Sequence, residues 1–246
     1  MIRVSAVSYT NTLPFIYGLA HHPVKKEIQL TVDYPALCAQ KLIDNEADIG
    51  LIPVASLLKL PEYHLVSDYC IGANGAVNSV YIFSNCPVKE IEFLQLDPES
   101  NTSNNLAFVL LTHYFKVNPV RLMNAVDYGE LKHPKAAFIQ IGDRTFGKQN
   151  LYPYAYDLAQ EWKNFTGLPF VFAAWVSNKK LPEKFVNAFS DALKLGLDNR
   201  KEVFKTMQMR DDFDLEDYLL HKIDYPLDAQ KREALTLFLN YVKALS

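Results

Sequence analysis

The first half of the chain alternates short apolar runs with segments of helical periodicity. Residues 2–8, 30–34 and 48–54 each carry the β-branched or apolar run expected of a buried parallel strand. Between the last two runs, residues 36–47 place alanine, leucine and isoleucine at helical spacing. This strand-helix-strand order predicts a parallel sheet that is covered by helices.

A second set of strands and helices begins near Pro87. Its predicted elements are strands at residues 93–96, 120–125, 136–141 and 169–176, and helices at residues 103–115 and 154–167. From Pro182 onward, apolar residues recur at helical spacing over almost all of the remaining chain. The whole pattern predicts an α/β protein.

The helices after Pro182 need a sheet to cover, and the first segment predicts a sheet with too few helices for both of its faces. We therefore expect a discontinuous lobe made of residues 1–86 and 173–246, with residues 87–172 inserted as a second α/β lobe. Two crossings of the chain would create a hinge between the lobes. The cleft beside such a hinge is a common place for a small ligand to bind.

The charge balance excludes some classes of partner. The chain has 246 residues, and 25 Lys and Arg against 28 Asp and Glu leave a formal net charge of −3. This balance offers no basic field for nucleic acid. The uncharged stretch at residues 69–88 is interrupted by glycine, asparagine and proline, which argues against a membrane span. Because the chain starts without a secretory signal, we expect a cytoplasmic protein with no nucleic-acid or membrane partner.

Several kinds of catalytic machinery are missing from the sequence. It contains no phosphate-binding glycine loop, no serine-hydrolase elbow and no metalloprotease helix. Cys38, Cys70 and Cys86 are odd in number and form no Cys-x-x-Cys pair, so we interpret them as reduced packing residues. The six histidines are scattered and are interpreted as surface or packing residues. We therefore expect neither a cofactor nor a metal ion.

Uncharged polar residues gather just after the first predicted strand. They are Ser8, Thr10, Asn11 and Thr12. Because a helix follows, their hydroxyl and amide groups and the helix N–H groups would lie at the carboxyl end of a strand, where α/β folds bind ligands. Capping of that helix by Thr10 or Asn11 is an equally good interpretation of the local sequence.

A second polar group begins a helix of the inserted lobe. It contains Ser100, Thr102 and Ser103. Hydroxyls and free N–H groups at a helix start suit a carboxylate or phosphate, and each charge-assisted hydrogen bond contributes roughly 1.5–3 kcal/mol. Helix capping is again the alternative. Two such groups in two lobes predict a cleft for a small molecule with two carboxylates. Ser79 would lie near the crossing between lobes, unless it is an ordinary strand serine.

Further candidates follow the strand at residues 136–141. Gly142, Asp143 and Arg144 stand at its ligand-facing end. Asp143 is expected either to act as a base or to cap and pair with Arg144. Among the aromatic residues between positions 152 and 175, Tyr154 alone is positioned to serve both as core and as cleft wall.

Taken together, these segments resemble the chorismate dehydratases of the futalosine route to menaquinone. Residues 7–14, VSYTNTLP, resemble the SYLNT-x-P opening of that family. Similar signatures follow in the same order at residues 47–54, 68–73, 79–80, 102–103, 141–143, 156–162 and 167–170. The resemblance covers residues 2–176. Thr10 and Leu13 depart from it, because relatives often carry Leu and a basic residue there, and Arg144 is the cation that would compensate at Leu13.

The resemblance implies a fold similar to type II periplasmic binding proteins and a function in menaquinone biosynthesis. The implied reaction removes water from chorismate, a dicarboxylate, to give 3-[(1-carboxyvinyl)oxy]benzoate. The resemblance also implies that Asn11 and Ser79 are the residues closest to catalysis. We expect Ser79, Thr102 and Ser103 to hold carboxylates. The proton would be taken either by Asp143 or by the enolpyruvyl carboxylate of the substrate. The oligomeric state is not predicted.

Two alternatives remain open. The sister enzyme 1,4-dihydroxy-6-naphthoate synthase has a similar fold, but its members typically carry a catalytic His-Glu pair where this chain has Gly142 and Asp143. That difference favours the dehydratase. The other alternative is a non-catalytic protein that binds a small dicarboxylate in the same cleft. The lack of a signal peptide and of a DNA-binding segment weighs against its transport and sensor forms.

Overall fold

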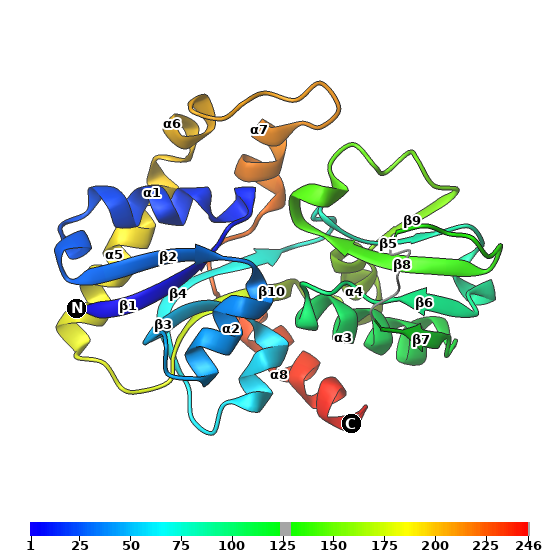
Figure 1. Ribbon diagram of the computed structural model, residues 1–246, viewed down its shortest axis with the longest axis horizontal. Coiled ribbons are helices and arrows are strands. Elements are labelled where there is room, and N and C mark those ends of the chain that lie inside the picture. The colour runs from blue at the N-terminus through cyan, green and yellow to red at the C-terminus, as the bar shows by residue number, and fades with distance from the viewer. Residues whose placement is uncertain (124–128, 246) are drawn as a thin grey trace.

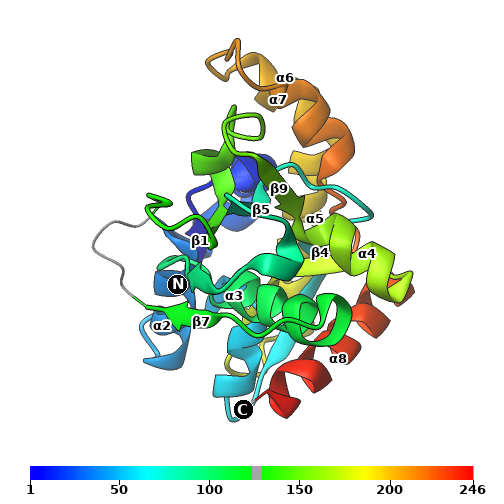
Figure 2. The same cartoon turned by 90° about the vertical axis from the view of Figure 1, so that its right-hand side faces the viewer.

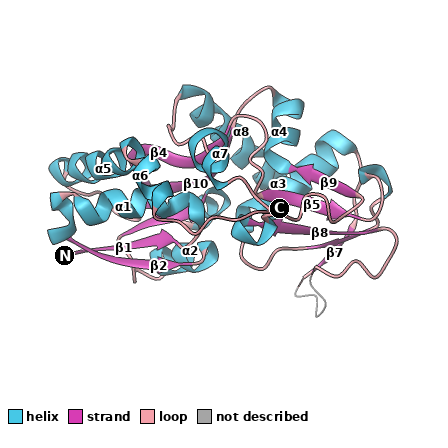
Figure 3. Cartoon of the chain, turned by 90° about the horizontal axis from the view of Figure 1, so that it is seen from above, coloured by secondary structure: helices cyan, strands magenta, loops and turns pink. Residues whose placement is uncertain are grey.

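The computed structural model describes residues 1–123 and 129–245 and shows two α/β lobes side by side (Figure 1). Each lobe contains one five-stranded sheet, and the two sheets lie at opposite ends of the molecule (Figure 3). The first sheet has the order β2 (Ile28–Asp33), β1 (Ile2–Val7), β3 (Ile49–Pro53), β10 (Phe170–Ser177) and β4 (His64–Ala73). The second has the order β7 (Val120–Leu122), β6 (Phe93–Gln95), β8 (Ala136–Ile141), β5 (Val80–Ser84) and β9 (Tyr154–Asp157).

One strand in each sheet runs against both of its neighbours. β1 pairs in parallel with β2 and β3, so the predicted parallel sheet is confirmed for these strands. β10 is antiparallel to β3 and β4, and β5 is antiparallel to β8 and β9. Both β5 and β10 are buried along their whole length, which explains their continuous apolar sequence. An apolar run indicates burial on both faces but does not give the direction of the strand.

Helices cover both sheets. α1 and α5 pack together on one side of the first sheet, and α2 lies on the other side (Figure 3). α3 and α4 pack against the second sheet, while α8 contacts both α3 and β10 and so touches both lobes (Figure 2). The helices are α1 (Leu13–His21), α2 (Pro35–Ile43), α3 (Asn101–Val109), α4 (Leu158–Thr166), α5 (Glu183–Asp198), α6 (Arg200–Lys205), α7 (Leu215–Asp217) and α8 (Ala229–Ala244).

Short 3-10 and π-helical segments complete the described part of the chain. They are the 3-10 turns η1 (Thr10–Thr12), η2 (Pro23–Lys26), η3 (Val54–Lys59), η4 (Val88–Glu90) and η6 (Gly142–Thr145), and the π-helical turns η5 (Leu110–Phe115) and η7 (Tyr218–Lys222). After η7, Asp224 and Leu227 donate backbone hydrogen bonds to Gly72 and Asp68 of β4. The C-terminal segment therefore runs beside the first sheet.

Some predicted boundaries are wrong. β5 pairs with strands of the second sheet, so the first crossing lies between Ala73 and Val80 and not at residue 86. The return boundary at residues 172–173 falls inside β10. The helix predicted at residues 154–167 begins only at Leu158, because the residues before it form β9. Part of the strand predicted at residues 120–125 lies outside the described residues.

Three broader expectations can be compared with the structure. Cys38, Cys70 and Cys86 are buried and unpaired, which confirms their interpretation as packing residues. Among the helices in the described part of the chain, none has the length and apolarity needed to cross a membrane. The region after Pro182 is mostly helical as predicted, although residues 207–214 between α6 and α7 are not.

The first crossing is held by one carboxylate. Asp157 accepts the N–H groups of Val77 at 3.0 Å and Asn78 at 2.7 Å with one oxygen. Its other oxygen accepts the N–H groups of Ala159 at 3.0 Å and Gln160 at 3.1 Å, which caps α4. One half-buried side chain thus fixes both the start of a helix and the segment that leads into β5.

A close helix crossing fixes the entrance to α1. Gly18 of α1 faces Gly196 of α5, and a Cβ atom at Gly196 would overlap the carbonyl oxygen of Pro14. A Cβ atom at Gly18 would likewise overlap the carbonyl oxygen of Ala192. Because α1 starts immediately after η1, this contact also sets the position of η1 at the end of β1.

Replacing this glycine tests the crossing. Alanine in an open helix position stabilises by about 1 kcal/mol relative to glycine. We expect the opposite sign for Gly196→Ala, with unfolding made easier by about 1–3 kcal/mol, because the added methyl group forces the two helices apart. Urea denaturation measures the change. Asn187→Ala on the exposed side of α5 is the control and should be neutral or stabilising. A stabilising Gly196→Ala would contradict the packing described here.

Asp157→Asn tests the anchor of the first crossing. Asparagine replaces one acceptor oxygen with an amide, so two backbone N–H groups lose their partner, and we expect a loss of about 1–3 kcal/mol in the free energy of unfolding. Asp214→Asn, at the exposed cap of α7, should change it by less than about 0.5 kcal/mol.

The same variant has a defined pH dependence. Burial raises the pKa of Asp157 to about 6, whereas the ordinary value is 3.8. Between these values the folded chain takes up a proton that the unfolded chain does not, so the wild type gains stability as the pH falls through this window. Asp157→Asn lacks this gain. We therefore expect its stability deficit in urea denaturation to grow on acidification; a deficit that shrinks would contradict the raised pKa.

Candidate functional site

A cavity lies where the two lobes meet. It has about 530 Å³ of space between atoms, its open mouth included. Its walls come from the end of β1, the turn η1, the first crossing, the start of α3 and the end of β8. The polar lining residues are Tyr9, Asn11, Ser79, Ser100, Thr102 and Ser103, and none of the described lining residues carries a charged side chain. Any anion bound here would therefore be held by neutral donors and helix N–H groups.

Asn11 and Ser79 both line this cavity and are joined by a third residue. The amide Nδ2 of Asn11 donates to the hydroxyl oxygen of Tyr218 at 3.2 Å. The hydroxyl of Tyr218 in turn donates to the hydroxyl oxygen of Ser79 at 3.0 Å. All three side chains are buried, and Asn11 and Ser79 both line the cavity. The two residues that the resemblance singles out therefore share one site.

Further hydrogen bonds hold Asn11 in place. The hydroxyl of Tyr225 donates to the backbone carbonyl of Asn11 at 2.9 Å. The hydroxyl of Thr12 donates to its side-chain oxygen Oδ1 at 3.2 Å. Thr12 therefore contacts Asn11 and is not among the lining residues of the cavity. With Tyr218 on the amide nitrogen, the side chain and backbone of Asn11 are fixed from three directions.

The start of α3 forms the wall contributed by the second lobe. Ser100 accepts the N–H of Ser103 at 3.1 Å, so the capping interpretation of Ser100 is confirmed. Thr102 accepts the N–H of Ala55 at 3.1 Å and so links this helix to η3 of the first lobe. Ser100, Thr102 and Ser103 nevertheless all line the cavity, so capping and lining occur together. The helix start directs partial positive charge toward this space.

Gly142 is required by the close approach of the lobes. Its φ of +63° is in the left-handed region, and a Cβ atom there would lie 2.8 Å from the ring of Tyr9. Its N–H donates to the backbone carbonyl of Ser79 at 2.8 Å. Gly142 therefore places the end of β8 against Ser79 and lets Tyr9 of the first lobe pack on it.

Besides Thr12 and Arg144, four more sequence candidates lie outside the cavity lining. Ser8 is exposed, and Tyr154 is an exposed residue of β9 whose ring stacks on Tyr156. Thr10 donates to Asp143 from its backbone N–H at 3.2 Å and from its hydroxyl at 2.9 Å. Burial raises the pKa of the Asp143 carboxyl. Thr10 and Asp143 thus connect the lobes next to the cavity, in a separate depression that also contains Leu13.

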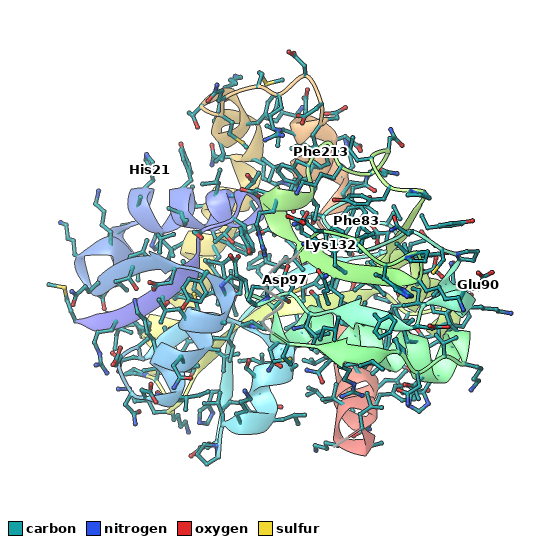
Figure 4. The ribbon with its side chains drawn as sticks, turned by 45° about the vertical axis from the view of Figure 1, so that its right-hand side comes forward. His21, Phe83, Glu90, Asp97, Lys132 and Phe213 are labelled. Carbon is teal, nitrogen blue, oxygen red and sulfur yellow. The ribbon has the colours of Figure 1, made fainter. Side chains whose placement is uncertain are left out.

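Arg144 is held by carboxylates. It donates to both oxygens of Asp97, at 2.8 Å and 2.9 Å, and pairs with Glu99 at 3.2 Å. Asp97 lies near the middle of the molecule (Figure 4). Tyr9 donates its hydroxyl to Glu99, so this ion pair is also tied to the first lobe. Because Arg144 does not line the cavity, the expectation that it replaces a cation at Leu13 is not supported.

Sequence reasoning missed three tyrosines of the site. Tyr9 lies inside the VSYTNTLP segment, where its aromatic ring gave no sign of a hydrogen bond to the other lobe. Tyr218 and Tyr225 lie after residue 176, where the resemblance ends. Their apolar neighbours predict helix and core, and no local pattern shows that two hydroxyls converge on Asn11.

Comparison with known proteins agrees with this architecture. A curated relative, the chorismate dehydratase of Campylobacter jejuni, is 26% identical over 98% of this chain and 97% of its own length. A crystal structure of a protein from Archaeoglobus fulgidus has a TM-score of 0.78 at 14% identity, covering 99% of this chain and 97% of that one. A Candida albicans protein with the generic periplasmic-binding-protein fold has a TM-score of 0.64 at 10% identity, covering 99% and 89%.

These likenesses confirm the predicted two-lobed α/β fold similar to periplasmic binding proteins. A family model described as menaquinone biosynthesis matches residues 2–244, which is nearly the whole chain. The match extends well beyond the N-terminal signatures and includes the C-terminal segment that carries Tyr218 and Tyr225. The chain therefore belongs to the menaquinone biosynthesis family.

Proposed function

We propose that this protein is a hydro-lyase that removes water from chorismate to give 3-[(1-carboxyvinyl)oxy]benzoate. The observation that carries the proposal is the meeting of Asn11 and Ser79 in one uncharged cavity between the lobes. The named activity of the relative from Campylobacter jejuni and the menaquinone family support the same substrate.

The cavity suits a ring with two carboxylates. Chorismate carries one carboxylate on its ring and one on its enolpyruvyl group. The start of α3 offers hydroxyls and helix dipole on one side, and we assign Thr102 and Ser103 to one carboxylate. Ser79 is assigned to the other, and Asn11 to the departing C4 hydroxyl. Apolar residues such as Ile71 and Phe172 complete the wall against which the ring would pack.

The chemistry needs a base for the C3 proton. The C3–H bond of chorismate is vinylogous to the ring carboxylate, so the electron pair that the departing proton leaves behind spreads onto that carboxylate. Expulsion of hydroxide from C4 then completes an aromatic ring, and the proton and hydroxide leave as water. The described lining residues include no carboxylate, imidazole or amine. We therefore assign the base to the enolpyruvyl carboxylate of the substrate itself, a group that binding already holds beside the reacting carbon.

The direct test is to incubate the purified protein with chorismate and to follow an aromatic product by ultraviolet absorbance and mass. We expect turnover by the wild type and a loss of about 10²-fold or more in kcat for Asn11→Ala, because a donor that acts in the transition state is removed. Asn164→Ala, on the surface of α4, is the control. Binding of chorismate without product would identify a binding protein. An unchanged kcat in Asn11→Ala would remove Asn11 from the mechanism.

Asp143→Asn separates the two possible bases. Asparagine keeps an oxygen for the Thr10 hydrogen bonds, so the contact between the lobes should persist. If the substrate supplies the base, kcat should fall by less than about tenfold, measured with saturating chorismate. A loss of about 10³-fold or more would instead assign proton removal to Asp143.

A further inference from the structure

Tyr218 is a buried phenol outside the cavity lining whose hydroxyl touches both central residues of the site. It begins the π-helical turn η7. Its ring packs edge-on against the rings of Phe146 and Phe213, with 5.2 Å and 5.5 Å between the ring centroids. Phe146 belongs to the inserted lobe, and Phe213, labelled in the upper part of Figure 4, belongs to the C-terminal segment. The position of the hydroxyl is therefore set by packing from both parts of the chain.

The number of protons on each group decides which group donates and which accepts in the hydrogen bonds between Asn11, Tyr218 and Ser79. The –NH2 group of Asn11 can only donate, so the oxygen of Tyr218 accepts from it. A phenol has a single proton, and that proton goes to the oxygen of Ser79. Ser79 therefore acts as acceptor on this side, and its own proton remains for another partner. The other amide proton of Asn11 also remains, because Tyr218 accepts only one of the two, and Thr12 contacts the side-chain oxygen and not the nitrogen.

We propose that Tyr218 is a positioning residue that commits Ser79 and Asn11 to act as hydrogen-bond donors toward an anionic group in the cavity. The inference rests on the proposed function for the identity of that group, a carboxylate or the departing oxygen of chorismate. It explains how a cavity without a charged lining residue in the described chain can attract a dianion. Without Tyr218, the Ser79 hydroxyl could turn its oxygen toward the carboxylate, and the two acceptors would repel.

Tyrosine suits this task for a further reason. Complete burial raises the pKa of Tyr218, so the phenol keeps its proton over the working range of the protein. The donor direction is thus independent of pH, unlike that of a histidine in the same place.

The test is Tyr218→Phe, which removes the hydroxyl and keeps the ring against Phe146. We expect kcat for chorismate to fall by about 10- to 100-fold, with a smaller change in KM. Binding of isophthalate, a benzene ring with two carboxylates, should weaken by about tenfold in calorimetry. Tyr81→Phe is the matched control, because Tyr81 is also buried and near Ser79, but its hydroxyl donates to Asn78 and its ring lies in a separate aromatic cluster. Both kcat and isophthalate affinity of Tyr81→Phe should stay within about twofold of the wild-type values.

A double-mutant cycle shows whether Tyr218 acts through Ser79. In a Ser79→Ala background, Tyr218→Phe should cause a clearly smaller loss in kcat and in isophthalate affinity than it causes in the wild type, because only its contact with Asn11 remains. Independent, multiplying effects would overturn the inference, and so would wild-type behaviour of Tyr218→Phe. A purely structural role would lower the melting temperature and leave no such coupling.

The two proposals fail in different ways. If the wild type forms product and Tyr218→Phe does so equally well, the positioning role is overturned and the dehydratase function stands. If the wild type forms no product but binds isophthalate in a Tyr218-dependent way, the function is overturned and the donor arrangement stands. If it neither forms product nor binds isophthalate, both are overturned.

A measurement on wild-type Tyr218 covers the case in which Tyr218→Phe does not fold. With ¹³Cζ-labelled tyrosine, one resonance should move in both Ser79→Ala and Asn11→Ala, because each removes one partner of the same hydroxyl. Tyr225 contacts only the Asn11 side of this pair and should not respond to Ser79→Ala. If no tyrosine resonance moves in both variants, the inference is overturned.

Discussion

An uncharged cavity can hold an anion only if its dipoles are already oriented when the anion arrives. In water, a serine hydroxyl or an asparagine amide turns freely and gains little by facing a carboxylate. In this cleft Asn11 and Ser79 are buried and bonded to Tyr218, and the start of α3 contributes N–H groups with a fixed direction. A low local dielectric then strengthens each contact. The surrounding fold is arranged to keep these few donors fixed.

Orientation in this cleft depends on contact between lobes, because the donors come from different parts of the chain. Asn11 belongs to the first lobe and Ser79 to the crossing that enters the second. Around these two residues the lobes are held together by the hydrogen bond from Thr10 to Asp143 and by the hydrogen bond from the Ala55 N–H to Thr102. These contacts use backbone N–H groups and short side chains, which break at modest free-energy cost.

The sequence was most informative about site residues that lie next to the end of a strand. Alternation of apolar runs and helical spacing predicts most elements of both sheets, and the N-terminal signature leads to Asn11. Ser79 follows from its place near the crossing. Local patterns cannot distinguish a helix cap from a ligand contact, and Ser100 proves to be both a cap and a lining residue. Thr10 is not a lining residue of the cavity, and its hydroxyl donates to Asp143 instead.

Long-range pairing explains the remaining misses. β5 has the apolar run of any buried strand, and only its partners β8 and β9 show that it belongs to the second sheet. Tyr218 is separated from Asn11 by 207 residues and from Ser79 by 139. Its hydroxyl reaches Asn11 and Ser79 only because the C-terminal segment folds back beside β4. A helical tail that looks like covering for a sheet thus contributes the hydroxyl that orders the site.

Neutral donors also fit the demands of an elimination better than a cation would. A lysine or arginine in the cavity would stabilise the carboxylates of the bound substrate as strongly as the charge that develops later, and binding of that kind lowers KM without raising kcat. Arg144, the nearest candidate cation from the sequence, is instead held by Asp97 and Glu99 outside the lining. Donors aimed by Tyr218 at one point in space act most strongly on charge that appears at that point. The pairing of Arg144 and the direction of Tyr218 therefore serve the same end, since they leave oriented neutral donors to face the charge that develops in the reaction.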